Sequence, residues 1–177
     1  MSLVKFSARN HPQQAIDDAV DDRATVPEVF DPLHRVYGFT IDVAAAAHNT
    51  KCPRYYTRAD DGLAQSWEGE SVWCNPPYSS IAPWVLKAWQ EHHHTGVIVM
   101  LLPANRTEQA WWQDLVEPYR DRADSPLGVT FLRGRIRFLK PGQTAIGANE
   151  RPPFGCCLLR WSGHKQFPAP SVQGVLL

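Results

Sequence analysis

The sequence lacks a long apolar run. None of its stretches approaches the ~18 consecutive apolar residues that a transmembrane helix requires. Its first residues, MSLVKFSARNHPQQ, also lack the apolar segment of a secretory signal peptide. From these two absences we expect a soluble, cytoplasmic protein. At 177 residues, 44% of them hydrophobic, the chain is long enough for one domain with a single core.

The sequence also has little that could hold a metal ion. It contains four cysteines, which we expect to be reduced thiols, and Cys52 and Cys74 match no zinc-binding spacing. Cys156 and Cys157 are adjacent in an expected strand, where successive side chains point to opposite faces. The histidines at residues 92–94 close an expected helix, so a solvent-exposed helix end is favoured over a metal site. We therefore expect no metal.

Neither sign of charge is in excess, because 18 lysines and arginines balance 18 aspartates and glutamates. The overall charge therefore does not indicate a polyanionic partner. A nucleic-acid site, if the chain has one, would have to be a local patch of basic residues.

Helical spacing of apolar residues predicts three helices, at residues 26–37, 81–92 and 105–118. In the first, Pro27 suits the opening turn and Gly38 is a stop signal. Ser79 and Ser80 are the expected cap of the second helix, and Asn105 is expected to open the third.

Strand-like runs alternate with these helices. They lie at residues 39–45, 54–57, 71–74, 96–103, 129–139 and 154–161. This alternation predicts an α/β three-layer sandwich with a mainly parallel, twisted sheet. The expected organisation is a flexible N-terminal arm at residues 1–24, one folded domain at residues 25–161 and a C-terminal tail at residues 162–177.

Two expected strands end in polar loops. Asp42 ends one of them, where a carboxylate is costly unless it has a partner, and Asn75 follows another. In parallel sheets, ligands bind at the carboxyl ends of the strands. We therefore expect both loops to border one binding site.

The second loop, Asn75-Pro76-Pro77-Tyr78, suits chemistry on the exocyclic amine of a base. Such an amine is a weak nucleophile because its lone pair is delocalised into the ring. The Asn75 side-chain carbonyl and the Pro76 backbone carbonyl can accept its two hydrogens, while the prolines fix φ and add no competing N–H. Tyr78 offers an aromatic face on which the base can stack. The proton can leave to water, so catalysis would consist mainly of positioning.

This tetrad resembles the (D/N/S)PP(Y/F) motif of S-adenosylmethionine-dependent amino methyltransferases. About three quarters of the chain, residues 25–161, resembles the phage-type DNA N6-adenine methyltransferase family. The segments that carry this resemblance are VFDPLHRVYGFTIDVAAAAHNTKCPRYYTRADDGLAQSW, VWCNPPYS, PWVLKA, VIVMLLPANR and FLRGRIRF. The resemblance implies a Rossmann-like fold of the class I methyltransferase type, with residues 25–161 as the methyltransferase domain. It also implies that Asn75, Pro76, Pro77 and Tyr78 are the catalytic residues.

The same resemblance implies a binding site for S-adenosylmethionine. Asp42, Ala44 and Ala45 would hold the methionine end of the cofactor, and Asp61 would lie near its adenine. The other residues implied are Asp60 at the ribose, Thr25 near the carboxylate and Phe30 beside it. Two departures from the family pattern are present: the loop DVAAAAHN has no Gly-x-Gly, and RATV stands where Trp-x-Thr-Pro is common.

The implied function is the transfer of a methyl group to N6 of an adenine flipped out of double-stranded DNA, in a bacterial or phage-infected cell. The resemblance further implies a phage or prophage origin and a role in modifying DNA against restriction. Arg133, Arg135 and Arg137 would share one face of the expected strand 129–139. They could bind DNA phosphates or simply form a solvated face. Two alternatives remain open: methylation of an RNA base or a protein glutamine, and an inactive DNA-binding module of the same fold.

Overall fold

The computed structural model describes residues 21, 24–120, 122–139 and 154–163. Most of the expected arm (residues 1–20, 22 and 23) and of the expected tail (residues 164–177) lies outside them. The described residues contain a six-stranded sheet and a separate two-stranded ribbon. In spatial order the sheet consists of β3 (Arg54–Tyr55), β2 (Ile41–Asp42), β4 (Ser71–Cys74), β5 (Val97–Pro103), β8 (Cys156–Ser162) and β6 (Leu127–Phe131).

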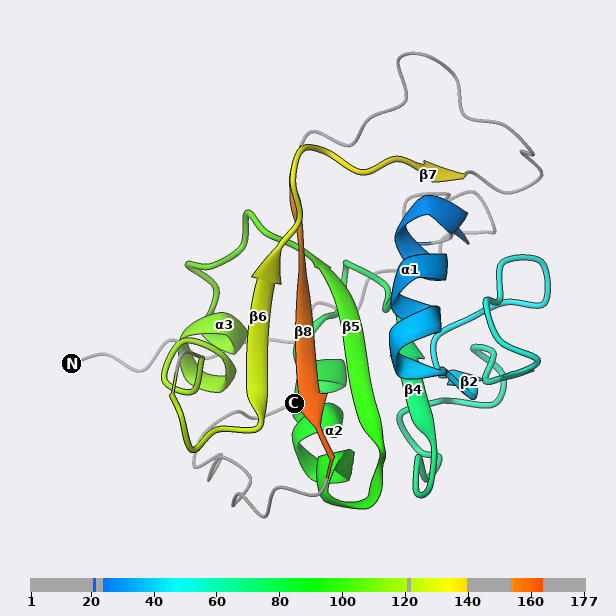
Figure 1. The fold of residues 1–177 in the computed structure, drawn as a ribbon, viewed down its shortest axis with the longest axis horizontal. Coiled ribbons are helices and arrows are strands. Elements are labelled where there is room, and N and C mark those ends of the chain that lie inside the picture. Colours follow the sequence, from blue (N-terminus) through cyan, green and yellow to red (C-terminus); the bar gives the residue numbers. More distant parts are fainter. Residues whose placement is uncertain (1–20, 22–23, 121, 140–153, 164–177) are drawn as a thin grey trace, which may run out of the picture.

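The sheet is mainly parallel. β3, β2, β4 and β5 are parallel neighbours, whereas β8 lies antiparallel between β5 and β6. β6 therefore runs in the same direction as β5, and both end at the same edge. Helix α1 (Pro27–Tyr37) covers one face, and α2 (Ala82–Glu91) and α3 (Ala110–Leu115) lie on the other (Figure 1). The predicted α/β three-layer architecture is confirmed.

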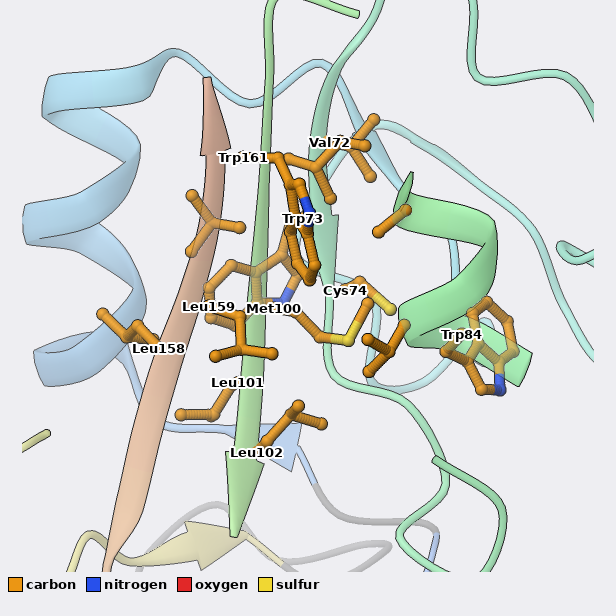
Figure 2. Close-up of a cluster of buried hydrophobic side chains, with 14 of the residues drawn as sticks. Val72, Trp73, Cys74, Trp84, Met100, Leu101, Leu102, Leu158, Leu159 and Trp161 are labelled. Carbon is orange, nitrogen blue, oxygen red and sulfur yellow. The ribbon is translucent and has the colours of Figure 1, made fainter. Parts of the chain in front are cut away.

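β5 is the centre of the core. All seven of its residues are buried, as expected for an unbroken apolar run covered on both faces. In Figure 2, Leu158 of β8 points toward the helix α1 and Trp84 lies on α2 at the opposite side of the sheet. Trp73 of β4 meets the ring of Phe30 from α1 edge-on at 5.3 Å. Each fully buried large apolar side chain of this kind contributes about 1.5–3 kcal/mol.

The helix predictions were right in position and partly wrong at the ends. α1 begins at Pro27, and Gly38 caps it in the left-handed conformation, φ 59°. The expected Ser79 and Ser80 cap of α2 is wrong, because Ile81 occupies the N-cap position and makes no side-chain cap. α3 does not open at Asn105: its N-cap is Gln109, in extended conformation, so residues 105–109 form a loop.

The strand predicted at residues 129–139 is broken. β6 ends at Phe131, and Gly134 follows in the left-handed conformation with φ 75°, which redirects the chain. The segment re-forms as β7 (Phe138–Leu139), which pairs antiparallel with β1 (Ala24–Thr25). Residues 132–137 are thus a loop at the carboxyl end of β6, and the prediction that their arginines alternate on a strand is wrong.

The histidines that follow α2 do not form a fully solvated helix end. His92–His94 make one 3₁₀ turn, η1, in which His92 is fully buried, His93 half-buried and His94 exposed. The reason is that His92 continues the buried stripe of α2, and its ring meets Trp89 edge-on at 5.5 Å. Within the described ranges, no group of three or more His, Cys, Asp or Glu side chains could hold a metal ion. No described helix has the length and apolarity to cross a membrane.

Candidate active site

The tetrad Asn75 to Tyr78 directly follows β4 at the carboxyl edge of the sheet. Pro76 and Tyr78 are buried, and Asn75 and Pro77 are half-buried. The loop then turns, with the Ser80 N–H donating to the Pro77 carbonyl at 3.1 Å, before α2 begins. The tetrad therefore lies between a central strand and a helix.

The ring of Tyr78 is enclosed by other aromatic rings. It is 9% exposed, and it meets Phe138 of β7 and Phe154 edge-on at 6.3 and 6.0 Å. Burial raises the pKa of its hydroxyl well above the ordinary value, with the Cys156 thiol alongside. In this structure the ring is not an open stacking surface, so a base could stack on Tyr78 only if a neighbouring ring moved.

Asp42 is the last residue of β2, and its carboxyl group binds the backbone of the loop that follows. Its side chain is 3% exposed and accepts backbone N–H groups from Lys51 at 3.0 Å and Ala44 at 3.4 Å. Burial raises the pKa of this carboxyl to about 6, although the two hydrogen bonds counteract the rise. The Ala45 N–H donates to the Tyr56 carbonyl, which ties the half-buried alanines to the residue after β3.

The loop around Asp60 and Asp61 packs against the end of β2. Asp61 has φ 52°, an unusual conformation for a residue other than glycine. The next residue, Gly62, lies so close to β2 that a Cβ atom there would sit 2.1 Å from the Val43 carbonyl oxygen. Asp60 accepts hydrogen bonds from the Thr57 N–H at 2.8 Å and its hydroxyl at 2.6 Å, and these bonds lower its pKa. Both carboxylates are exposed.

Thr25 and Phe30 have different surroundings. Thr25, in β1, is 1% exposed, and its hydroxyl has no hydrogen-bond partner among the described residues. A buried hydroxyl without a partner is uncommon and fits a site that accepts a polar ligand. Phe30 is 6% exposed and packs on Trp73 and Phe39, so its contacts place it in the core.

The pairing of the strands brings two of the predicted groups together. Asp42 is the direct partner of Trp73, two residues before Asn75, and the Val43 N–H donates to the Trp73 carbonyl at 3.1 Å. The arginines lie apart from these loops, between β6 and β7. Arg133 and Arg135 are exposed and Arg137 is half-buried.

Sequence reasoning missed two residues at the tetrad. Arg106, in the loop after β5, donates from Nη1 to the Tyr78 carbonyl. Asp21, which belongs to the expected N-terminal arm, accepts the N–H and the hydroxyl of Ser79. Arg106 could have been found, because it follows a predicted central strand at the same edge as Asn75. The sequence carries no signal for the contact of Asp21.

The family model described as DNA N-6-adenine-methyltransferase (Dam) matches residues 13–166. The DNA N-6-adenine-methyltransferase of Escherichia phage T1 is 34% identical over 160 residues, which are 83% of this chain and 66% of that protein. The protein of the same name from Haemophilus phage HP1 (strain HP1c1) is 37% identical over 78 residues, 44% of each chain.

A third relative is YfdM of Escherichia coli (strain K12), 30% identical over 83 residues, which are 43% of this chain and 87% of YfdM. The chain thus spans just under two thirds of the length of the T1 protein and less than half of the HP1 protein. Since the family model matches most of its length, the chain belongs to the DNA N-6-adenine-methyltransferase (Dam) family.

Proposed function

We propose that this chain transfers the methyl group of S-adenosylmethionine to N6 of an adenine in double-stranded DNA, in the cytoplasm of a bacterial or phage-infected cell. The observation that carries the proposal is the position of Asn75 and Pro76 at the carboxyl end of β4, beside the loop that follows Asp42. Two phage relatives bear the name of this activity, which supports the choice of DNA as the acceptor.

The residues present fit the cofactor. The buried Thr25 hydroxyl has an unused hydrogen-bonding capacity suited to a carboxylate, and Asp42 supplies a buried carboxyl at the edge of the sheet. Ala44, Ala45, Asp60 and Asp61 border the same loops, whereas Phe30 would act only by packing behind them. S-adenosylmethionine supplies an electrophilic methyl group when it is bound.

The tetrad would make the adenine amine reactive. The Asn75 side-chain carbonyl and the Pro76 backbone carbonyl accept its two hydrogens, which localises the lone pair on N6 and directs it toward the methyl carbon. The methylated amine would then release a proton to water. The base reaches this position by leaving the duplex. The side chain of Phe138 or Phe154 has to move away from the Tyr78 ring before the base can stack on it.

The direct test is transfer of labelled methyl to unmethylated duplex DNA, RNA and protein, followed by nucleoside analysis. We expect label in N6-methyladenine of DNA. Asn75→Ala should lower kcat by at least ~100-fold, because it removes an acceptor that orients the amine, while cofactor affinity changes little. Turnover of Asn75→Ala within a few fold of the wild type would contradict the assigned role, and label in RNA or protein alone would replace DNA as the acceptor.

A further inference from the structure

We propose that Arg106, assisted by Asp21, is a positioning residue that fixes the backbone of the Asn75 to Tyr78 tetrad in its catalytic geometry. The inference rests on the proposed methyl transfer. In this role both residues hold the loop, and neither contacts the substrate.

The need for such a residue follows from the composition of the tetrad. Pro76 and Pro77 have no N–H, so this stretch of backbone loses two of the donors that ordinarily anchor a loop. The pairing of β4 with β5 ends at Cys74 and Met100, one residue before the tetrad. The position of the Pro76 carbonyl, the proposed second acceptor, therefore depends on what holds the residues after it.

Two side chains from distant segments hold those residues. Arg106 is half-buried in the loop after β5, and its Nη1 donates to the carbonyl of Tyr78. On the following residue, Asp21 accepts the Ser79 N–H at 3.2 Å through Oδ1 and the Ser79 hydroxyl through Oδ2. The donor and acceptor groups on either side of the Tyr78–Ser79 peptide bond are thus both fixed by charged side chains.

The cationic group of Arg106 could instead bind a DNA phosphate, and the two roles predict different kinetics. A phosphate contact affects DNA binding: its loss would raise KM for DNA and lower the log–log salt slope by about 1. A positioning contact affects the geometry of the reacting groups: its loss lowers kcat and leaves KM for DNA and for the cofactor unchanged.

The experiment measures kcat, both KM values and the salt slope for Arg106→Ala and Arg106→Lys. Arg122→Ala is the matched control, since Arg122 is an exposed arginine paired with Asp124, in the segment before β6 and hence at the opposite edge of the sheet. We expect Arg106→Ala to lower kcat about 10- to 100-fold with both KM values within about twofold. Arg106→Lys should recover part of the loss, and Arg122→Ala should match the wild type.

Wild-type kcat in Arg106→Ala, or a raised KM for DNA with a reduced salt slope, would overturn the inference. Hydrogen exchange at the amides of Tyr78 and Ser79 tests the clamp separately from activity: Arg106→Ala should accelerate it and Arg122→Ala should not. If the wild type transfers no methyl group, the proposed function fails, and this exchange measurement still decides whether Arg106 holds the loop.

Discussion

Asp42 is the residue of the proposed cofactor site whose ionisation the fold alters most clearly. Its pKa is raised to about 6 by burial, so the carboxyl is protonated below that pH and ionised above it. If the ionised form is the one that holds the methionine end of the cofactor, then affinity depends on a titration close to neutral pH. Few carboxyl groups titrate there, which makes the role of this residue measurable.

We expect the Kd for S-adenosylmethionine to rise as the pH falls through 6, and to be about tenfold higher at pH 5 than at pH 8. The Kd rises at low pH because protonation of Asp42 removes the negative charge that would attract the ammonium group of the cofactor. Calorimetry between pH 5 and 8 measures the effect. Asp42→Asn is the control, since it should bind weakly at every pH. A flat profile in the wild type would exclude Asp42 as the ionised partner.

Among single residues, surroundings that follow from a local cost or a motif could be predicted. An acid that ends an apolar strand needs partners, and Asp42 has two backbone N–H groups as partners. The motif placed Asn75 directly after a strand, where the structure has it. The position of Arg106 after β5 indicates its edge of the sheet. The hydrogen bonds of Arg106 and Asp21 could not be predicted, because each joins the side chain to a loop distant in sequence and no residue pattern encodes such a pairing. The enclosure of Tyr78 by Phe138 and Phe154 is of the same kind.

At the scale of elements, α1, α2 and β5 could be predicted because burial imposes a strong period or an unbroken apolar run on their sequences. The break between β6 and β7 could not. The alternation of residues 129–139 fits a strand throughout, and only the left-handed conformation of Gly134 turns the chain away. The loop that results carries Arg133, Arg135 and Arg137 at the same edge of the sheet as the tetrad.

This arginine loop is predicted to contact DNA phosphates. Replacing Arg133, Arg135 and Arg137 together with alanine should reduce the magnitude of the slope of log K against log salt by about 2–3. The reason is that each phosphate contact releases about one counterion from the DNA, and the variant makes fewer such contacts. Titration of duplex DNA at several salt concentrations measures the slope. The control is Arg120→Ala with Arg122→Ala, whose arginines form ion pairs with Glu117 and Asp124. An unchanged slope in the triple variant would show that the arginines are only a solvated surface.

At the scale of the whole molecule, the alternation of strands and helices predicts the layers but not the order of the strands. Chain order would place β6 next to β5, yet β8 pairs with both and separates them. The cause is the strong apolar character of β8, whose Cys157, Leu159 and Trp161 are fully buried. Such a strand is more stable in the interior of a sheet than at its edge, whereas β6 ends in the exposed Thr130 and Phe131.

The same core contains His92, which makes the stability of the whole molecule depend on pH. Its side chain is fully buried, Nδ1 lies 2.7 Å from the Trp89 carbonyl, and Nε2 has no hydrogen-bond partner among the described residues. Burial lowers its pKa, so the folded state takes up this proton less readily than the unfolded state does. The contribution of neutral His92 to stability is complete above the ordinary pKa of about 6.5 and is lost as the pH falls toward the lowered one.

Below about pH 6.5, we therefore expect the free energy of unfolding to fall more steeply with decreasing pH in the wild type than in His92→Phe. The difference should be up to about 1.4 kcal/mol per pH unit. Phenylalanine keeps a ring against Trp89 and cannot be protonated, so the difference between the two proteins isolates this one group. Urea unfolding at several pH values between 5 and 8 measures the effect. His94→Phe, at an exposed position in the same turn, should follow the wild type. If His92→Phe lost stability with pH as steeply as the wild type, protonation of His92 would not limit the stability of the fold in acid.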